Sequence, residues 1–279
     1  MFVILDETFK LANGARIPKI ALGTWQTPDD MAASAVIAAI DAGYKHIDTA
    51  AVYGNERGVG EGLAVALKKT GIHRESIFLT SKIPAEVKSY KGAEQSIQDS
   101  FERLATPHID MMLIHWPKPW IEMKDPNAPS YFAENLEVWK AMEEANECGK
   151  IRCLGVSNFS IDDIKNIQDN CRVQPVVNQI RVHIGHVPTE LIEFCHTNGI
   201  RVEAYSPNAT GRLANVPAVC EMAKKYGVSV PQLANRFCLQ LNLVTLPKST
   251  HAERIIENGN LDFEISVSDM EQLLELPEI

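Results

Sequence analysis

Short apolar runs alternate with longer amphipathic segments along almost all of this 279-residue chain, and this alternation limits the folds that it can adopt. The runs that have the length and composition of strands lie at residues 20–22, 45–47, 77–80, 110–114, 153–156, 176–178, 201–204 and 244–246. The segments with helical spacing lie at residues 27–43, 55–71, 92–105, 131–149, 160–170, 189–198, 217–241 with a break near 227, 251–258 and 268–276. Strands that alternate with helices predict parallel βαβ units with right-handed crossovers.

Two α/β architectures satisfy this alternation, an open doubly wound sheet and a closed (β/α)8 barrel. A dinucleotide-binding open sheet carries GxGxxG directly after its first strand, whereas Gly23-Thr24-Trp25 follows that strand here. The glycine-rich stretch from Gly58 to Gly62 lies inside a helical pattern, and we interpret it as a place of close helix packing. We therefore predict a single (β/α)8 TIM barrel domain over residues 1–279.

The first residues of the chain predict a β-hairpin in front of the barrel. Two short β-type runs, at residues 8–11 and 16–19, flank the pair Asn13-Gly14. Asn-Gly between such runs is the strongest local hairpin signal, because both residues tolerate the positive φ of a tight turn. We expect this hairpin to cap the barrel.

Composition excludes several classes of partner. The formal net charge of −9 argues against a nucleic-acid or anionic-membrane surface. The uninterrupted apolar stretches are far shorter than the ~20 residues that cross a bilayer. The first ten residues contain Asp6 and Glu7 and do not resemble a signal peptide. We expect a cytoplasmic, monomeric protein that acts on a small molecule and binds neither nucleic acid nor membrane.

Polar side chains follow almost every expected strand. They belong to Thr24, Asp48, Lys82, His115, Ser157, Asn158, Gln179, Tyr205, Ser206, Lys248 and Ser249. Taken singly, Asp48 is explained as a helix cap, Lys82 as a solvated loop lysine and His115 as a hydrogen-bonded core histidine. In a barrel, however, all strands end at one rim, which is where active sites lie. The joint occurrence of these side chains therefore indicates one convergent site.

Four of the residues near this rim allow carbonyl chemistry. A tyrosine ordinarily has a pKa of about 10, too high for efficient proton exchange at neutral pH. Lys82 near Tyr53 is expected to lower that pKa, while Asp48 keeps Lys82 charged. His115 offers a donor that orients and polarises a carbonyl oxygen. A reduction also needs a hydride, which no side chain provides, so we expect a nicotinamide cofactor.

Longer sequence motifs surround these residues between residue 43 and residue 258. They are GYKHIDTA at 43–50 with YGNE at 53–56, TSK at 80–82, LIHWP at 113–117, GVSNF at 155–159, VNQ at 177–179, YSP at 205–207 and LPKS at 246–249 with Arg254, Glu257 and Asn258. These strings resemble the aldo-keto reductase superfamily. The pattern is similar to that of prokaryotic and plant members that reduce small aldehydes and ketones, including those that act on diketo-gluconate.

The resemblance implies a role for each matching residue. Tyr53 would be the general acid, Lys82 and Asp48 would tune it, and His115 would orient the carbonyl group. The implied cofactor is NADPH, and the residues implied to bind it are Gly23, Thr24, Asp48, Ser157, Asn158, Gln179, Tyr205, Ser206, Pro207, Asn208, Leu213, Lys248, Ser249, Thr250, Arg254, Glu257 and Asn258. The substrate would contact Trp25, Tyr53, His115 and Trp116. Independently of the resemblance, Lys248, Ser249 and Arg254 at the start of a short expected helix are typical of an anion site.

Several positions depart from the pattern of the superfamily. Asn208 stands where leucine is usual, Arg181 where an acidic residue is common, and Pro84 where a pocket tryptophan is frequent. The chain stops at Ile279, shortly after the last expected helix, so we expect the C-terminal substrate loop to be missing or nearly so. No metal is expected. Two alternatives stay open, a NAD-preferring alcohol or sugar dehydrogenase and a non-catalytic regulatory member of the family.

Overall fold

The computed structural model describes residues 2–125 and 127–279. Strands β1 (Thr8–Lys10) and β2 (Arg16–Pro18) form an antiparallel pair at the N-terminus. The turn between them includes Gly14 with φ +89°, a backbone conformation that glycine adopts at no steric cost. The expected hairpin is therefore confirmed.

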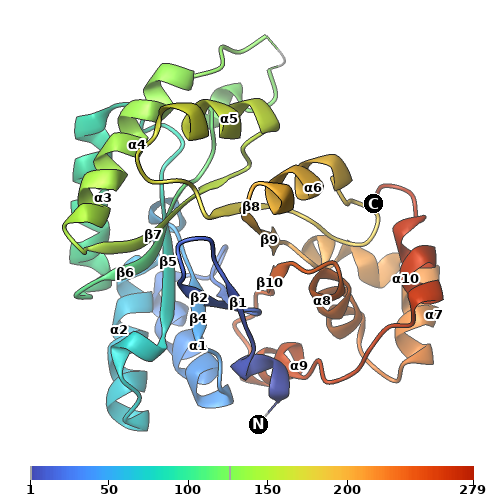
Figure 1. The fold of residues 1–279 in the computed structure, drawn as a ribbon. Helices are drawn as coiled ribbons and strands as arrows, with labels where there is room; N and C mark the ends of the chain where they lie inside the picture. The colour runs from blue at the N-terminus through green and yellow to red at the C-terminus, as the bar shows by residue number, and fades with distance from the viewer. Residues whose placement is uncertain (1, 126) are drawn as a thin grey trace.

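Eight further strands form one parallel sheet in the order in which they occur in the chain. They are β3 (Leu22–Gly23), β4 (His46–Asp48), β5 (Phe78–Ile83), β6 (Ile109–Ile114), β7 (Ile151–Ser157), β8 (Val177–Arg181), β9 (Arg201–Tyr205) and β10 (Val244–Leu246). The first and last of them also meet, because the Ala21 amide donates to the Thr245 carbonyl at 3.0 Å and the Gly23 amide to that of Pro247 at 2.9 Å. The sheet thus closes into the expected (β/α)8 barrel (Figure 1).

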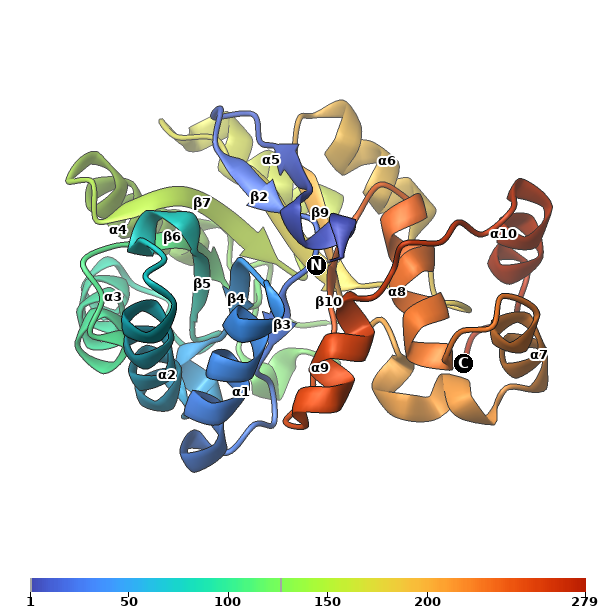
Figure 2. The ribbon, with the colours of Figure 1, turned by 90° about the horizontal axis from the view of Figure 1, so that it is seen from below.

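Helices surround the barrel (Figures 1 and 2). They are α1 (Asp29–Ala42), α2 (Glu56–Thr70), α3 (Tyr90–Leu104), α4 (Phe132–Glu147), α5 (Ile161–Asn170), α6 (Thr189–Thr197), α7 (Pro217–Lys225), α8 (Val230–Gln240), α9 (Ala252–Gly259) and α10 (Val267–Leu274). Strands β5 and β6 are buried along their full length, as expected for parallel strands covered on both faces. None of the helices in the described part of the chain is long and apolar enough to cross a membrane.

The glycines of α2 allow its neighbours to approach closely. A Cβ atom on Gly60 would lie 2.3 Å from the carbonyl oxygen of Leu104 in α3, and one on Gly62 would lie 2.6 Å from that of Ala33 in α1. No side chain fits at such distances. The interpretation of this stretch as close helix packing is confirmed.

The two ends of the barrel differ in what covers them. Leu11 and Ile17 of the hairpin belong to the core cluster that contains Phe78, Cys153 and Val244, so the hairpin closes the end at which the strands begin. The opposite end is bordered by loops that carry short 3-10 helices, η2 (Ala51–Tyr53), η4 (Trp120–Glu122) and η5 (Ala209–Asn215).

Candidate active site

A cleft of about 1070 Å³ opens at the end of the barrel where the strands finish. Most of the residues expected to form the site line it. These are Gly23, Trp25, Asp48, Tyr53, His115, Trp116, Ser157, Asn158, Gln179, Tyr205, Ser206, Pro207, Asn208, Lys248, Ser249, Thr250, Arg254, Glu257 and Asn258.

Three of the expected site residues are buried behind the wall of the cleft. The hydroxyl group of Thr24 donates to the carbonyl oxygen of Asp48 at 3.0 Å, so Thr24 supports a strand end. Leu213 is fully buried in the main core cluster. The side chain of Lys82 is also fully buried, and it acts on the cleft through its neighbours.

Other lining residues were not expected from the sequence, namely Gln26, Val52, Ser229, Pro231, Leu246 and His251. Ser229 begins α8 with a capping box, in which its hydroxyl accepts from the backbone amide of Gln232. A capping signal marks a helix start and carries no information about a cleft. Its position in the wall therefore follows from tertiary packing alone.

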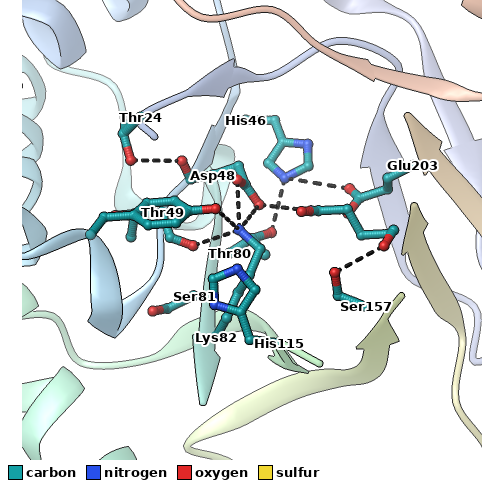
Figure 3. Close-up of polar contacts among 12 residues, drawn as sticks. Thr24, His46, Asp48, Thr49, Thr80, Ser81, Lys82, His115, Ser157 and Glu203 are labelled. Atoms are coloured by element: carbon teal, nitrogen blue, oxygen red, sulfur yellow. Dashed lines mark hydrogen bonds and ion pairs between the residues drawn. The ribbon is translucent and has the colours of Figure 1, made fainter. Parts of the chain in front are cut away.

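Lys82 and Asp48 form an ion pair at the bottom of the cleft (Figure 3). The Lys82 ammonium donates to both carboxylate oxygens of Asp48, at 2.7 and 2.9 Å, and to the Thr49 carbonyl at 2.9 Å. Strands β4 and β5 are adjacent in the sheet, which brings the two side chains together. Burial acts to lower the pKa of Lys82, but Asp48 and Tyr53 outweigh it and the pKa lies above its ordinary value. Lys82 is therefore a cation at neutral pH.

Tyr53, at the end of η2, points its hydroxyl at this cation. The Lys82 Nζ lies 3.4 Å from the Tyr53 Oη. Burial raises the pKa of the Tyr53 phenol above its ordinary value, although Lys82 acts to lower it. The expected net lowering is not found, because burial outweighs the ammonium. The phenol is consequently protonated at neutral pH and is able to donate.

His115, directly after β6, faces both Tyr53 and Trp120. Its ring centroid lies 5.5 Å from that of Tyr53 and 5.1 Å from that of Trp120, both in edge-to-face geometry. Burial, followed by the charge of Lys82, lowers the pKa of His115 well below its ordinary value. The imidazole is therefore neutral at physiological pH, with a single N–H to donate.

In the wall of the cleft formed by the ends of β7, β8 and β9, the side chains form hydrogen bonds with one another and with the backbone. The Ser157 hydroxyl donates to the Gln179 carbonyl at 2.9 Å, the Asn158 amide donates to the Ser157 hydroxyl at 2.9 Å, and the Tyr205 hydroxyl donates to the Asn158 side-chain oxygen at 2.9 Å. Asn158 also has φ +61°, a left-handed conformation that asparagine tolerates better than most residues. This wall is thus organised without a ligand.

The far end of the cleft is cationic. Lys248 and Arg254 have no carboxylate oxygen within ion-pair distance among the residues that the structure describes. The Ser249 hydroxyl accepts from the backbone amide of His251 at 3.0 Å, next to the start of α9. Two cations that lack a carboxylate partner in the described residues, beside a helix N-terminus, favour a bound anion.

Comparison with known proteins agrees with this geometry. The model of the Aldo/keto reductase family matches residues 19–278. The chain belongs to the aldo/keto reductase family. The resemblance of the sequence motifs is thereby confirmed.

Relatives of this aldo/keto reductase include a glyoxal reductase of Bacillus subtilis, which is 38% identical over 271 residues covering 96% of this chain and 92% of the relative. The solved aldo/keto reductase of Brucella melitensis has a TM-score of 0.88 and 34% identity, with 99% of both chains covered. An aldo-keto reductase of Bombyx mori solved in complex with NADP has a TM-score of 0.86 and 33% identity, covering 96% of this chain and 92% of that one.

Two of the departures from the family pattern also lie at or near the cleft of this aldo/keto reductase. Asn208 lines the cleft, and its side-chain oxygen is buried with no hydrogen-bond partner in the described residues. Arg181, at the end of β8, lies 3.7 Å from the Glu278 carboxylate.

Proposed function

We propose that the protein is an NADPH-dependent carbonyl reductase in which Tyr53 is the general acid. The observation that carries the proposal is the buried Lys82–Asp48 pair, whose ammonium lies 3.4 Å from the Tyr53 hydroxyl at the floor of the cleft. A carbonyl oxygen that gains electron density needs a proton from a nearby acid. The protonated phenol supplies it, and the ammonium stabilises the phenolate that is left.

His115 orients the substrate in this proposal. A neutral imidazole donates one hydrogen bond, and its position beside the Tyr53 ring allows the carbonyl oxygen to accept from both side chains. Such a donor pair also polarises the carbonyl group as negative charge develops on its oxygen. The hydride itself comes from the reduced nicotinamide when that cofactor is bound.

The residues of the cleft fit such a cofactor. Ser157, Asn158 and Gln179 present polar atoms for the nicotinamide carboxamide, and Tyr205 lies beside them as a flat surface for stacking. At the other end, Lys248 and Arg254 lack carboxylate partners in the described part of the chain and would pair with a 2′-phosphate. Charge-assisted hydrogen bonds of this kind favour NADPH over NADH, which lacks that phosphate. The NADP found in the Bombyx mori structure supports this assignment.

The substrate side of the cleft is aromatic. Trp116 and Trp120 lie 5.4 Å apart between ring centroids, and Trp25 is 46% exposed at the mouth. These surfaces suit small carbonyl compounds with modest apolar parts, and the name of the Bacillus subtilis relative, glyoxal reductase, supports the inclusion of α-dicarbonyls.

The test is NADPH oxidation by the purified protein with aldehydes, α-dicarbonyls, aldoses and keto-sugars, repeated with NADH. We expect turnover with NADPH, fastest with small activated carbonyls. Faster turnover with NADH would instead identify a NAD-preferring dehydrogenase. A folded protein that binds NADPH and turns over none of these classes would identify a regulatory member of the family.

A further inference from the structure

Glu203 is a buried acidic residue that the roles given above do not use. It lies on β9 inside the barrel, and its side chain has no exposed surface. The side-chain nitrogen of Gln179 donates to Glu203 Oε2 at 2.8 Å and to Asp48 Oδ2 at 2.9 Å. Both hydrogens of the Gln179 amide are therefore used by carboxyl groups on the inner side.

Two hydrogen bonds constrain an amide more than one does. A single bond to Asp48 leaves the amide plane of Gln179 free to turn about that bond, whereas a second bond to Glu203 fixes the plane. With the nitrogen held inward, the carbonyl oxygen Oε1 is the polar atom that Gln179 offers to the cleft that it lines. That oxygen accepts a hydrogen bond and cannot donate one.

We propose that Glu203 is a positioning residue that holds the Gln179 amide so that its carbonyl oxygen accepts from the carboxamide N–H of the nicotinamide. The inference rests on the proposed function, because it needs the nicotinamide at this wall of the cleft. It deepens that function by naming the group that sets the orientation of a cofactor contact.

The surroundings of Glu203 show that it acts as an acceptor and needs no charge to do so. Asp48 already balances Lys82, and the nearest ring nitrogen of His46 lies 3.9 Å from Glu203 Oε1. His46 is neutral, because burial lowers its pKa to about 3. Among the residues that the structure describes, no second cation is therefore left inside the barrel to balance Glu203. An uncharged glutamine of the same shape retains an acceptor oxygen, so Glu203→Gln is expected to preserve the function.

A cofactor analogue isolates this contact. The 3-acetylpyridine analogue of NADP carries a methyl group in place of the carboxamide NH2, so it lacks the proposed donor. Dissociation constants of NADP and of the analogue are measured by fluorescence titration for the parent protein, Glu203→Leu and Glu203→Gln. Thr80→Val is the matched control, since Thr80 is buried in the barrel and its hydroxyl bonds His46, with no hydrogen bond to Gln179 among the described residues.

We expect the parent to bind NADP about three- to tenfold more tightly than the analogue, the effect of one uncharged hydrogen bond. The ratio of the two dissociation constants falls toward one in Glu203→Leu and stays at the parent value in Glu203→Gln and Thr80→Val. A variant that is merely less stable binds both cofactors more weakly and keeps their ratio. If Glu203→Leu does not fold, Glu203→Thr replaces it, because the threonine side chain is too short to reach Gln179.

The possible failures are distinct. A parent protein without any preference overturns the proposed location of the carboxamide, and the inference with it. A parent that discriminates while Glu203→Leu discriminates equally overturns the role of Glu203 and leaves the proposed function intact. Loss of the preference in Glu203→Gln overturns the view that an uncharged acceptor is sufficient.

Discussion

Lys82 contacts the Tyr53 hydroxyl from behind the wall of the cleft, and Asp48 holds its ammonium in place. Its ammonium lies 2.7 Å from the Asp48 carboxylate and 3.4 Å from the Tyr53 hydroxyl, while its own side chain is fully buried. The same ion pair thus lies in the buried interior of the barrel and acts on the pKa of the Tyr53 phenol. We expect removal of either partner to affect both the fold and this pKa.

Lys82→Met is expected to destabilise the fold. The substitution leaves the Asp48 carboxylate buried without its cation, which costs about 3–5 kcal/mol in free energy of unfolding when one member of a buried pair is removed. Denaturant unfolding monitored by circular dichroism measures this loss. The double variant Lys82→Met/Asp48→Asn removes the unpaired charge and is expected to recover part of it; no recovery would contradict the explanation.

Tyr53→Phe is expected to lower the rate of carbonyl reduction by roughly 10²–10⁴, the usual contribution of a positioned general acid. The ring and its packing remain, so the melting temperature and NADPH affinity stay close to those of the parent. Single-turnover NADPH oxidation measures the chemical step separately from cofactor release. A near-normal rate would show that the proton comes from His115 or from water.

Arg254→Ala is expected to weaken NADPH binding by roughly tenfold or more, because a charge-assisted hydrogen bond contributes about 1.5–3 kcal/mol. NADH affinity should hardly change, since NADH has no 2′-phosphate. Fluorescence titration with both cofactors measures the difference. Arg16→Ala, which removes an exposed arginine of the hairpin, is the control. If Arg254→Ala weakened the binding of NADPH and NADH equally, the assignment of Arg254 to the 2′-phosphate would be wrong.

Glu203 predicts a pH-dependent stability. Burial, and after it the charge of Asp48, raises the pKa of this carboxyl group from 4.5 to about 8. Between these two values the folded protein holds a proton that the unfolded chain has lost, so the free energy of unfolding falls as pH rises. Glu203→Gln does not titrate, and we expect the parent to lose thermal stability relative to Glu203→Gln between pH 5 and 8. If the melting temperatures of the parent and of Glu203→Gln change equally with pH across this range, the raised pKa of Glu203 is refuted.

Gly60→Ala is expected to destabilise the protein by about 1–3 kcal/mol, the usual cost of overpacking. The added Cβ meets the Leu104 carbonyl oxygen at 2.3 Å, and backbone atoms cannot move aside as a flexible side chain does. Thermal unfolding measures the effect. Glu61→Ala, at the neighbouring exposed position of α2, serves as the control for a substitution by alanine that adds no contact; a Gly60→Ala protein as stable as this control would contradict the packing argument.

The sequence predicts the barrel well because its signals are local. Hydrophobic period and turn residues locate the strands and the hairpin, and parallel connections then bring every strand end to one rim. This reasoning places Asp48, His115 and Gln179 in the same cleft without knowledge of any contact.

Other features depend on side-chain direction and on neighbours from distant strands. Thr24 lies between two cleft residues in the sequence and Leu213 two positions after one, but both side chains are buried in the protein interior. Glu203 follows a strand pattern in which a glutamate is usually solvent-exposed, and its hydrogen-bond partner in the interior, the Gln179 amide, comes from a different strand. The balance that leaves the pKa of Tyr53 raised is likewise set by the depth of burial.

The hydrogen bonds between Ala21 and Thr245 and between Gly23 and Pro247 join the beginning of the chain to a segment near its end. During synthesis, β3 therefore has one unpaired edge until residues 245–247 have left the ribosome. Contacts between residues so far apart in the sequence form slowly. Until they form, the unpaired strand edges promote aggregation. Lys248 and Arg254 emerge long after Asp48 and Lys82. Nascent chains that end before these two residues lack part of the wall of the cleft, so the cleft is complete only once the ring of strands has closed.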